Sequence, residues 1–191
     1  MDALEAIFTR RSVGKVSDER PGREEIARLL EAAVRAPTHY LTEPWRFIVL
    51  TGPMLETLGE VMAERVRRER AGSPDVEARV RLAQARPLRA PVIVVVVYVP
   101  STHPRALELE DRYSVGAAMQ NLLLAAHATG MAAHLRTGEA ATDPAIHKLL
   151  GLHEGEEIAG FVYLGYPAAS SSTPTRRTPA EDRTTWLGWD Q

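Results

Sequence analysis

The chain contains no cysteine, which excludes disulfides, thiolate metal sites and cysteine nucleophiles. Lysine is nearly absent as well, because only Lys15 and Lys148 accompany 21 arginines. The longest strongly apolar run covers residues 91–100 and is far shorter than the roughly 18 residues that a membrane-spanning helix needs. Residues 1–5 lack the basic and apolar regions of a signal peptide. We therefore expect a cytoplasmic protein with no membrane partner.

Several sequence signatures of enzymes are also missing. There is no G-x-G-x-x-G after a predicted strand and no G-x-x-x-x-G-K-[ST], which argues against Rossmann and P-loop nucleotide sites. Neither H-E-x-x-H nor G-x-S-x-G occurs, and His147 and His153 do not share a helix face. We therefore expect neither a metal site nor serine hydrolysis. The formal net charge of −2 gives no reason to expect a nucleic-acid partner.

The remaining composition is that of a soluble globular protein, with 45% hydrophobic and 25% charged residues in 191 positions. We expect a single domain over residues 1–191, of the α+β class, with a mixed sheet of about four strands flanked by helices. Residues 92–99 are nearly all β-branched without alternation, which predicts a central strand that is buried on both faces. The predicted helices cover residues 2–8, 21–34, 54–70, 75–86, 114–129 and 142–150, and the other predicted strands cover 45–50, 131–135 and 157–166.

The predicted helix 114–129 is apolar almost all round, so we expect it to be buried, in part against a second subunit. It contains Asn121, the only asparagine of the chain, for which a hydrogen bond to a neighbouring loop and a contact with a ligand are equally plausible. The acidic cluster Glu108, Glu110 and Asp111 precedes it. We interpret this cluster as a solvated helix start rather than as a general acid and base.

Two segments have the residue types of a binding site. Arg10, Arg11 and Ser12 offer two guanidinium groups and a hydroxyl, which suit a phosphate. The segment 35–47 crowds two prolines, two threonines, a histidine and a tryptophan between a helix and a strand, and such a loop is more often a binding loop than a spacer. Each signal is weak alone, because paired arginines are common on surfaces and the loop could be a rigid turn.

The order of these motifs resembles the FMN-dependent nitroreductase family, and in particular its small bacterial members. The resemblance extends over nearly the whole chain. It is carried by Arg10-Arg11-Ser12, by residues 35–39 followed by 44–47, by the helix segment 116–127, by residues 135–138 and by residues 160–167.

The resemblance implies a homodimer that holds two FMN molecules at the subunit interface, each contacted by both chains. It implies that NADH or NADPH reduces the flavin, which then reduces a nitro compound or a related electron-poor small molecule by a ping-pong mechanism. The chemistry would be carried by FMN, without a catalytic side chain. The implied cofactor-binding residues are Arg10, Arg11 and Ser12 at the phosphate, Arg35, Thr38 and His39 in the loop, Leu135, Arg136 and Thr137 along the isoalloxazine, and Arg176 or Arg177 in the tail.

The chain departs from the family pattern at two positions. Many members have a basic residue where this chain has Gly14, so Arg35 becomes our candidate for the flavin pyrimidine. Many small members have tryptophan where this chain has Leu135, which leaves less aromatic cover. The tail contains Trp186 and Trp189 in a polar context, and we expect it to extend onto the partner subunit.

Two other functions remain open from the sequence. Members of the wider superfamily fragment reduced flavin or dehalogenate their substrates, and such an enzyme would yield a new flavin product in air. The other is a non-catalytic flavin-binding or interaction protein, and a colourless monomer that ignores added FMN would favour it. The sequence identifies neither the acceptor nor the preferred reductant.

Overall fold

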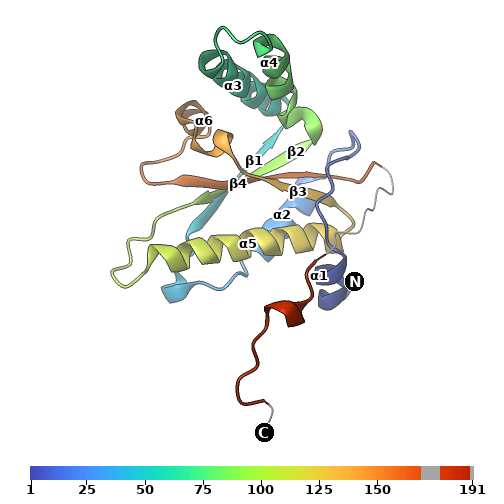
Figure 1. Cartoon of the computed structure of the whole chain (residues 1–191), viewed down its shortest axis with the longest axis vertical. Coiled ribbons are helices and arrows are strands. Elements are labelled where there is room, and N and C mark those ends of the chain that lie inside the picture. The colour runs from blue at the N-terminus through green and yellow to red at the C-terminus, as the bar shows by residue number, and fades with distance from the viewer. Residues whose placement is uncertain (169–176, 190–191) are drawn as a thin grey trace.

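A four-stranded sheet lies between two layers of helices in the computed structural model, which describes residues 1–168 and 177–189 (Figure 1). The strands are β1 (Trp45–Thr51), β2 (Val92–Tyr98), β3 (Ala132–Arg136) and β4 (Glu157–Gly165), in the order β1-β2-β4-β3. The α+β class and the four strands are confirmed. Every pair is antiparallel, whereas we expected a mixed sheet. Helical connections permit either orientation, so the pattern of elements alone did not decide it.

The predicted central strand is confirmed, because every residue of β2 is buried. Its side chains alternate between two separate apolar cores, one on each face of the sheet. Val94 and Val96 pack toward the first core, and Val95 and Val97 pack toward the second. This two-sided burial explains why the strand lacks an alternation of polar and apolar residues.

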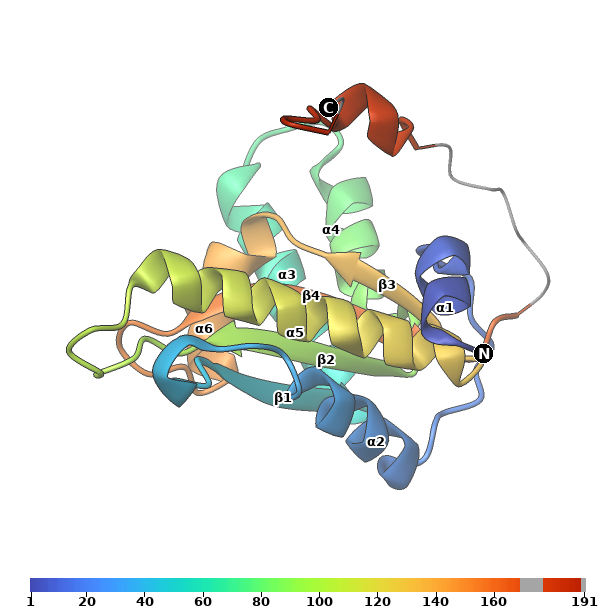
Figure 2. The same ribbon diagram turned by 90° about the horizontal axis from the view of Figure 1, so that it is seen from below.

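The helices divide between the two faces of the sheet (Figures 1 and 2). One face is covered by α2 (Arg23–Ala33) and α5 (Glu108–Ala128), and α1 (Ala3–Thr9) packs against α5. The other face is covered by α3 (Pro53–Glu69), α4 (Val76–Ala85) and α6 (Pro144–Leu149). The 3-10 turns are η1 (His39–Leu41), η2 (Pro87–Arg89), η3 (Glu139–Thr142) and η4 (Ala180–Arg183).

The helix starts follow from local capping. The Asp2 carboxylate accepts a hydrogen bond of 2.9 Å from the backbone N–H of Glu5, and Asp143 accepts one of 2.7 Å from Ala145. Each carboxylate satisfies a backbone donor that has no partner within the helix. These caps fix where α1 and α6 begin, close to the predicted positions.

Helix α5 begins at Glu108, six residues before the predicted start. The acidic residues of its first turn interact favourably with the helix dipole, a signal that apolar periodicity alone does not register. Our interpretation of a solvated cluster was wrong for Asp111, which is only 2% exposed and accepts a 2.6 Å hydrogen bond from the Thr42 hydroxyl. Asn121 is half-buried and lines a shallow cavity beneath α1.

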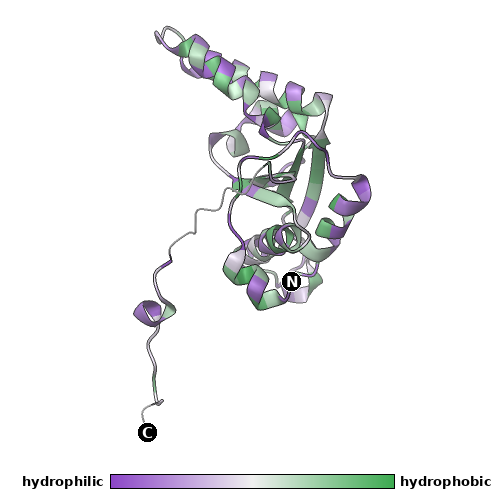
Figure 3. Ribbon diagram, turned by 90° about the vertical axis from the view of Figure 1, so that its right-hand side faces the viewer, coloured by the Kyte–Doolittle hydropathy of each residue, from purple (hydrophilic) through white to green (hydrophobic). Residues whose placement is uncertain are grey.

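Large apolar side chains remain exposed on α1, on η1 and near the start of α5. Phe8 is 80% exposed, Leu41 83% and Tyr113 66%. In the tail, the rings of Trp186 and Trp189 lie 5.3 Å apart in a tilted arrangement and are also exposed. Figure 3 shows this tail lying away from the sheet and its helices. Among the described residues, no helix is both long and apolar enough to cross a membrane.

Candidate functional site

The segment after α1 is held against the open edge of β3. The backbone N–H of Val13 donates to the carbonyl of Ala133 at 3.0 Å, and Ser17 donates to Tyr166 at 2.8 Å. Between them, Val16 forms a β-bridge with Pro167. Arg10, Arg11 and Ser12 therefore emerge at the junction of α1, β3 and the end of α5.

This junction carries two positive charges that are not held in ion pairs, although Glu5 of α1 lies nearby. In the described part of the chain, neither Arg10 nor Arg11 forms an ion pair, and the buried Nε of Arg11 has no hydrogen-bond partner. A buried donor without a partner is costly, so its environment is incomplete without a further acceptor. The exposed hydroxyl of Ser12 adds a third donor. The donor set fits the phosphate of FMN, as the sequence resemblance implies.

His127, at the end of α5, lies close enough to these arginines for their charges to shift its pKa. Its Nε2 lies 2.8 Å from the Thr9 hydroxyl. Burial lowers the pKa of His127, and the nearby charges of Arg11 and Arg10 lower it further. The same two charges lie at the helix C-terminus, where cations are favoured.

Strand β3 presents different side chains to its two sides. Leu135 turns toward the core beneath α5, so only its backbone could approach a flavin at the strand edge. His134 and Arg136 point to the opposite side, where the Arg136 guanidinium lies 5.7 Å from the Tyr163 ring centre. Thr137 follows as an exposed residue.

Gly14 leaves room for the His134 ring. A Cβ at position 14 would lie 3.2 Å from His134 Nδ1, an atom that is buried without a hydrogen-bond partner. Burial lowers the pKa of His134, and the charges of Arg136 and Arg89 lower it further. Sequence reasoning missed His134 and Arg89, although the unusual Gly14 was a signal that another side chain takes this space.

The second predicted segment lies elsewhere, in the turn before β1. Arg35 is exposed, and the buried Oγ1 of Thr38 has no hydrogen-bond partner. His39 Nδ1 lies 3.6 Å from a carboxylate oxygen of Glu110. The turn that follows is strained, because Tyr40, Leu41 and Glu43 have φ values of 52°, 52° and 43°.

The two predicted segments lie at opposite ends of α5. Glu110, next to His39, and His127, next to Arg10 and Arg11, are about 25 Å apart at a rise of about 1.5 Å per residue. Figure 2 shows α1 near one end of α5 and the blue turn before β1 near the other. One chain therefore does not bring His39 together with Arg10, Arg11 and Ser12.

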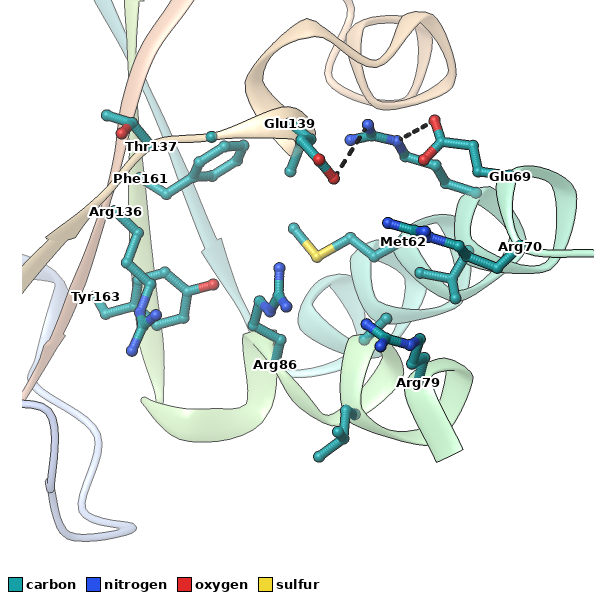
Figure 4. A pocket seen from close by; sticks show the side chains of 16 residues that line it. Met62, Glu69, Arg70, Arg79, Arg86, Arg136, Thr137, Glu139, Phe161 and Tyr163 are labelled. Carbon is teal, nitrogen blue, oxygen red and sulfur yellow. Dashed lines mark hydrogen bonds and ion pairs between the residues drawn. The ribbon is translucent and has the colours of Figure 1, made fainter. Parts of the chain in front are cut away.

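Arg136 and Thr137 also line a cavity of about 390 Å³ between α3, α4 and the ends of β3 and β4 (Figure 4). Its wall includes five arginines and two glutamates. The sequence predicted the two long helices that cover this cavity, over residues 54–70 and 75–86. Of the tail candidates, Arg176 lies outside the described residues, and Arg177 is exposed at the start of the described tail.

Comparison with known proteins identifies relatives over nearly the whole chain. The model of the "Nitroreductase family" matches residues 7–166. A relative from Escherichia coli K12, provisionally named NAD(P)H nitroreductase YdjA, is 33% identical over 173 residues, which cover 91% of this chain and 92% of the relative.

Two solved structures share the fold. A nitroreductase-like family protein from Bacillus cereus has a TM-score of 0.82 and 25% identity, over 98% of this chain and 97% of that chain. A provisionally assigned nitroreductase from Desulfovibrio desulfuricans, solved in complex with FMN, has a TM-score of 0.70 and 28% identity, over 93% of this chain and 92% of that chain. The chain belongs to the nitroreductase family.

Proposed function

We propose that the protein is an FMN-dependent oxidoreductase that transfers two electrons from NADH or NADPH to nitro compounds or related electron-poor small molecules. The observation that carries the proposal is the pair Arg10 and Arg11, which lies beside β3 without a carboxylate partner and with a buried donor left unsatisfied. Family membership, the FMN complex of one relative and the NAD(P)H nitroreductase name of another support it.

The residues of the chain bind and orient the cofactor in this proposal. Arg10, Arg11 and Ser12 hold the FMN phosphate, and the backbone around Arg136 and Thr137 lies along the ring system. When bound, FMN accepts a hydride from the nicotinamide and passes two electrons to the acceptor. For a nitro group the balance is one NAD(P)H and one proton consumed, with a nitroso product, NAD(P)⁺ and one water formed.

A homodimer completes the proposed site. Arg35, Thr38 and His39 would reach the flavin of the partner subunit, because in their own chain α5 separates His39 from the arginine pair. The exposed side chains of Phe8, Leu41 and Tyr113 provide apolar surface for such an interface. The exposed tryptophans of the tail would cover the partner subunit.

An absorbance spectrum of the purified protein tests the proposal. We expect a yellow protein whose flavin bands bleach on anaerobic addition of NADH or NADPH and return when a nitroaromatic acceptor is added. A protein that stays colourless with added FMN would contradict the proposal. A new flavin product formed in air would instead identify the flavin-fragmenting chemistry.

A further inference from the structure

We propose that the cavity between α3, α4 and β4 binds the carboxylate of an aromatic acceptor, so that the enzyme prefers acidic nitroaromatic compounds over neutral ones. This inference rests on the proposed function and names the substrate class of the same site. It is carried by the distribution of charge, hydrogen-bond donors and apolar surface within the cavity (Figure 4).

Two of the five arginines are already neutralised by carboxylates of the chain. Arg65 contacts Glu69 at 2.7 Å and also lies near Glu139 and Asp143, at 3.4 and 3.5 Å. Arg79 pairs with Asp75 at 2.6 Å. These pairs form the wall along α3 and α4 and offer little free charge to a ligand.

The other three arginines of the cavity have no such partner. Within residues 1–168 and 177–189, no carboxylate lies within ion-pair distance of Arg70, Arg86 or Arg136. With five arginines against two glutamates, the cavity wall is positive although the chain as a whole carries −2. An anion that enters the cavity would therefore be attracted by charges that nothing else neutralises.

Tyr163 adds a neutral donor beside these charges. Tyr163 as a whole residue is only 5% exposed, and its hydroxyl has no hydrogen-bond partner in the described structure. Burial raises the pKa of Tyr163, so the hydroxyl keeps its proton and can donate. Figure 4 shows this hydroxyl and the Arg86 side chain pointing into the same space, a combination that suits a carboxylate.

An aromatic ring suits the remainder of the cavity. Met62 and Phe161 are buried and line the side next to the charged groups, and Leu82 and Ala83 extend this apolar surface. An apolar cavity of about 150 Å³ is enough to hold benzene, so about 390 Å³ leaves room for one substituted ring.

The position of the cavity favours the acceptor over the phosphate of NADPH. Arg136 and Thr137 belong both to the cavity wall and to the predicted flavin edge, and an acceptor must lie beside the flavin to receive electrons. A ribose phosphate would gain nothing from Met62 and Phe161.

The test compares para-nitrobenzoate with para-nitrobenzamide, which has nearly the same shape but no charge. The measurement is the ratio of their kcat/KM values, in the FMN-loaded wild type and in the variants Arg86→Gln and Arg70→Gln. We expect wild type to favour the benzoate, and Arg86→Gln to lower the ratio by about tenfold, the size of one charge-assisted hydrogen bond. Arg67→Gln is the matched control, because Arg67 lies on α3 outside the cavity and pairs with Glu64.

A second readout does not depend on turnover. Calorimetry should detect binding of para-nitrobenzoate to the oxidised FMN-loaded wild type. The Arg86→Gln variant should bind para-nitrobenzoate more weakly, and the wild type should bind para-nitrobenzamide more weakly. Equal kcat/KM values for the two acceptors in wild type would overturn the inference, and so would a ratio that Arg86→Gln leaves unchanged. In either case, reduction of para-nitrobenzamide would still support the proposed function. The inference would also be overturned if Arg86→Gln changed only the NADPH to NADH preference or only the affinity for FMN. Failure of the proposed function itself would show as an absence of FMN binding and of reduction of either acceptor.

Discussion

The two ends of α5 differ in how their charges are balanced. At its start, Arg112 donates to Glu157 at 2.8 and 3.0 Å and to Glu108 at 2.8 Å, and Asp111 accepts from Thr42. At its end, Arg10 and Arg11 lie near His127, and neither arginine forms an ion pair in the described part of the chain, although Glu5 is close enough to oppose their effect on the pKa of His127. The charged side chains at the start of α5 have partners within the fold, whereas the two arginines at its end have no ion-pair partner in the described chain.

This difference separates a structural role from a binding role. The start of α5 contacts both sides of the strained turn at Tyr40, Leu41 and Glu43, through Glu110 beside His39 and Asp111 beside Thr42, and strain of this kind persists only where surrounding contacts fix it. We propose that the unpaired charges at the other end form an anion site. In our account a two-fold partner brings the fixed turn of one chain to the anion site of the other.

The largest effect should come from removing charge at the unpaired end. Arg10→Ala should weaken FMN binding by about 1.5–3 kcal/mol, the scale of a charge-assisted hydrogen bond, which is roughly 10- to 150-fold in Kd. Fluorescence titration with FMN measures this. Arg81→Ala, on the exposed side of α4, is the control and should retain wild-type affinity. Equal affinity in all three proteins would show that the phosphate lies elsewhere.

A change at the paired end should act on stability. Asp111→Ala leaves the Thr42 hydroxyl without its acceptor and frees the strained turn, so we expect a loss of about 2 kcal/mol in the free energy of unfolding. Urea denaturation at pH 7 measures it. Asp111→Asn keeps an acceptor of similar shape and should lose less. If the two variants were equally stable, the hydrogen bond would not be what holds the turn.

The smallest effect concerns the titration of His127. Its pKa is lowered by burial and by Arg11 and Arg10, so below about pH 6.5 the unfolded chain binds a proton that the folded chain does not. Stability should therefore fall as the pH drops through this window. In NMR titrations, Arg11→Gln and bound FMN should each raise the pKa of His127, whereas Arg81→Gln should not. If neither Arg11→Gln nor bound FMN raised the pKa of His127, then His127 would not lie beside the proposed anion site.

Much of the fold could be predicted because its helices and strands have distinct apolar periods. The burial of β2 followed from its β-branched run, and the start of α6 followed from Asp143-Pro144. The strand orientation and the burial of Asp111 could not be predicted, since both depend on how distant segments meet. Asp111 accepts its hydrogen bond from Thr42, which is far away in sequence.

The sequence allowed the motifs of the candidate site to be predicted, but not the way in which packing brings distant residues together around a cavity. Arg10, Arg11 and Ser12 have residue types that suit a phosphate, and this assignment stays a prediction. The cavity arginines Arg70 and Arg86 directly follow α3 and α4, and only the packing of these helices over β4 brings them together.

Subunit complementation tests most directly whether each flavin site is built from two chains. One variant combines Arg10→Ala with Ser12→Ala, and the other combines Arg35→Ala with His39→Ala. Each homodimer should bind FMN weakly, because every site lacks one half. A heterodimer, isolated by two different affinity tags after co-expression, combines both intact halves in one of its two sites. We predict that it binds one FMN per dimer with wild-type affinity. A heterodimer that binds FMN as weakly as its parents would contradict the account.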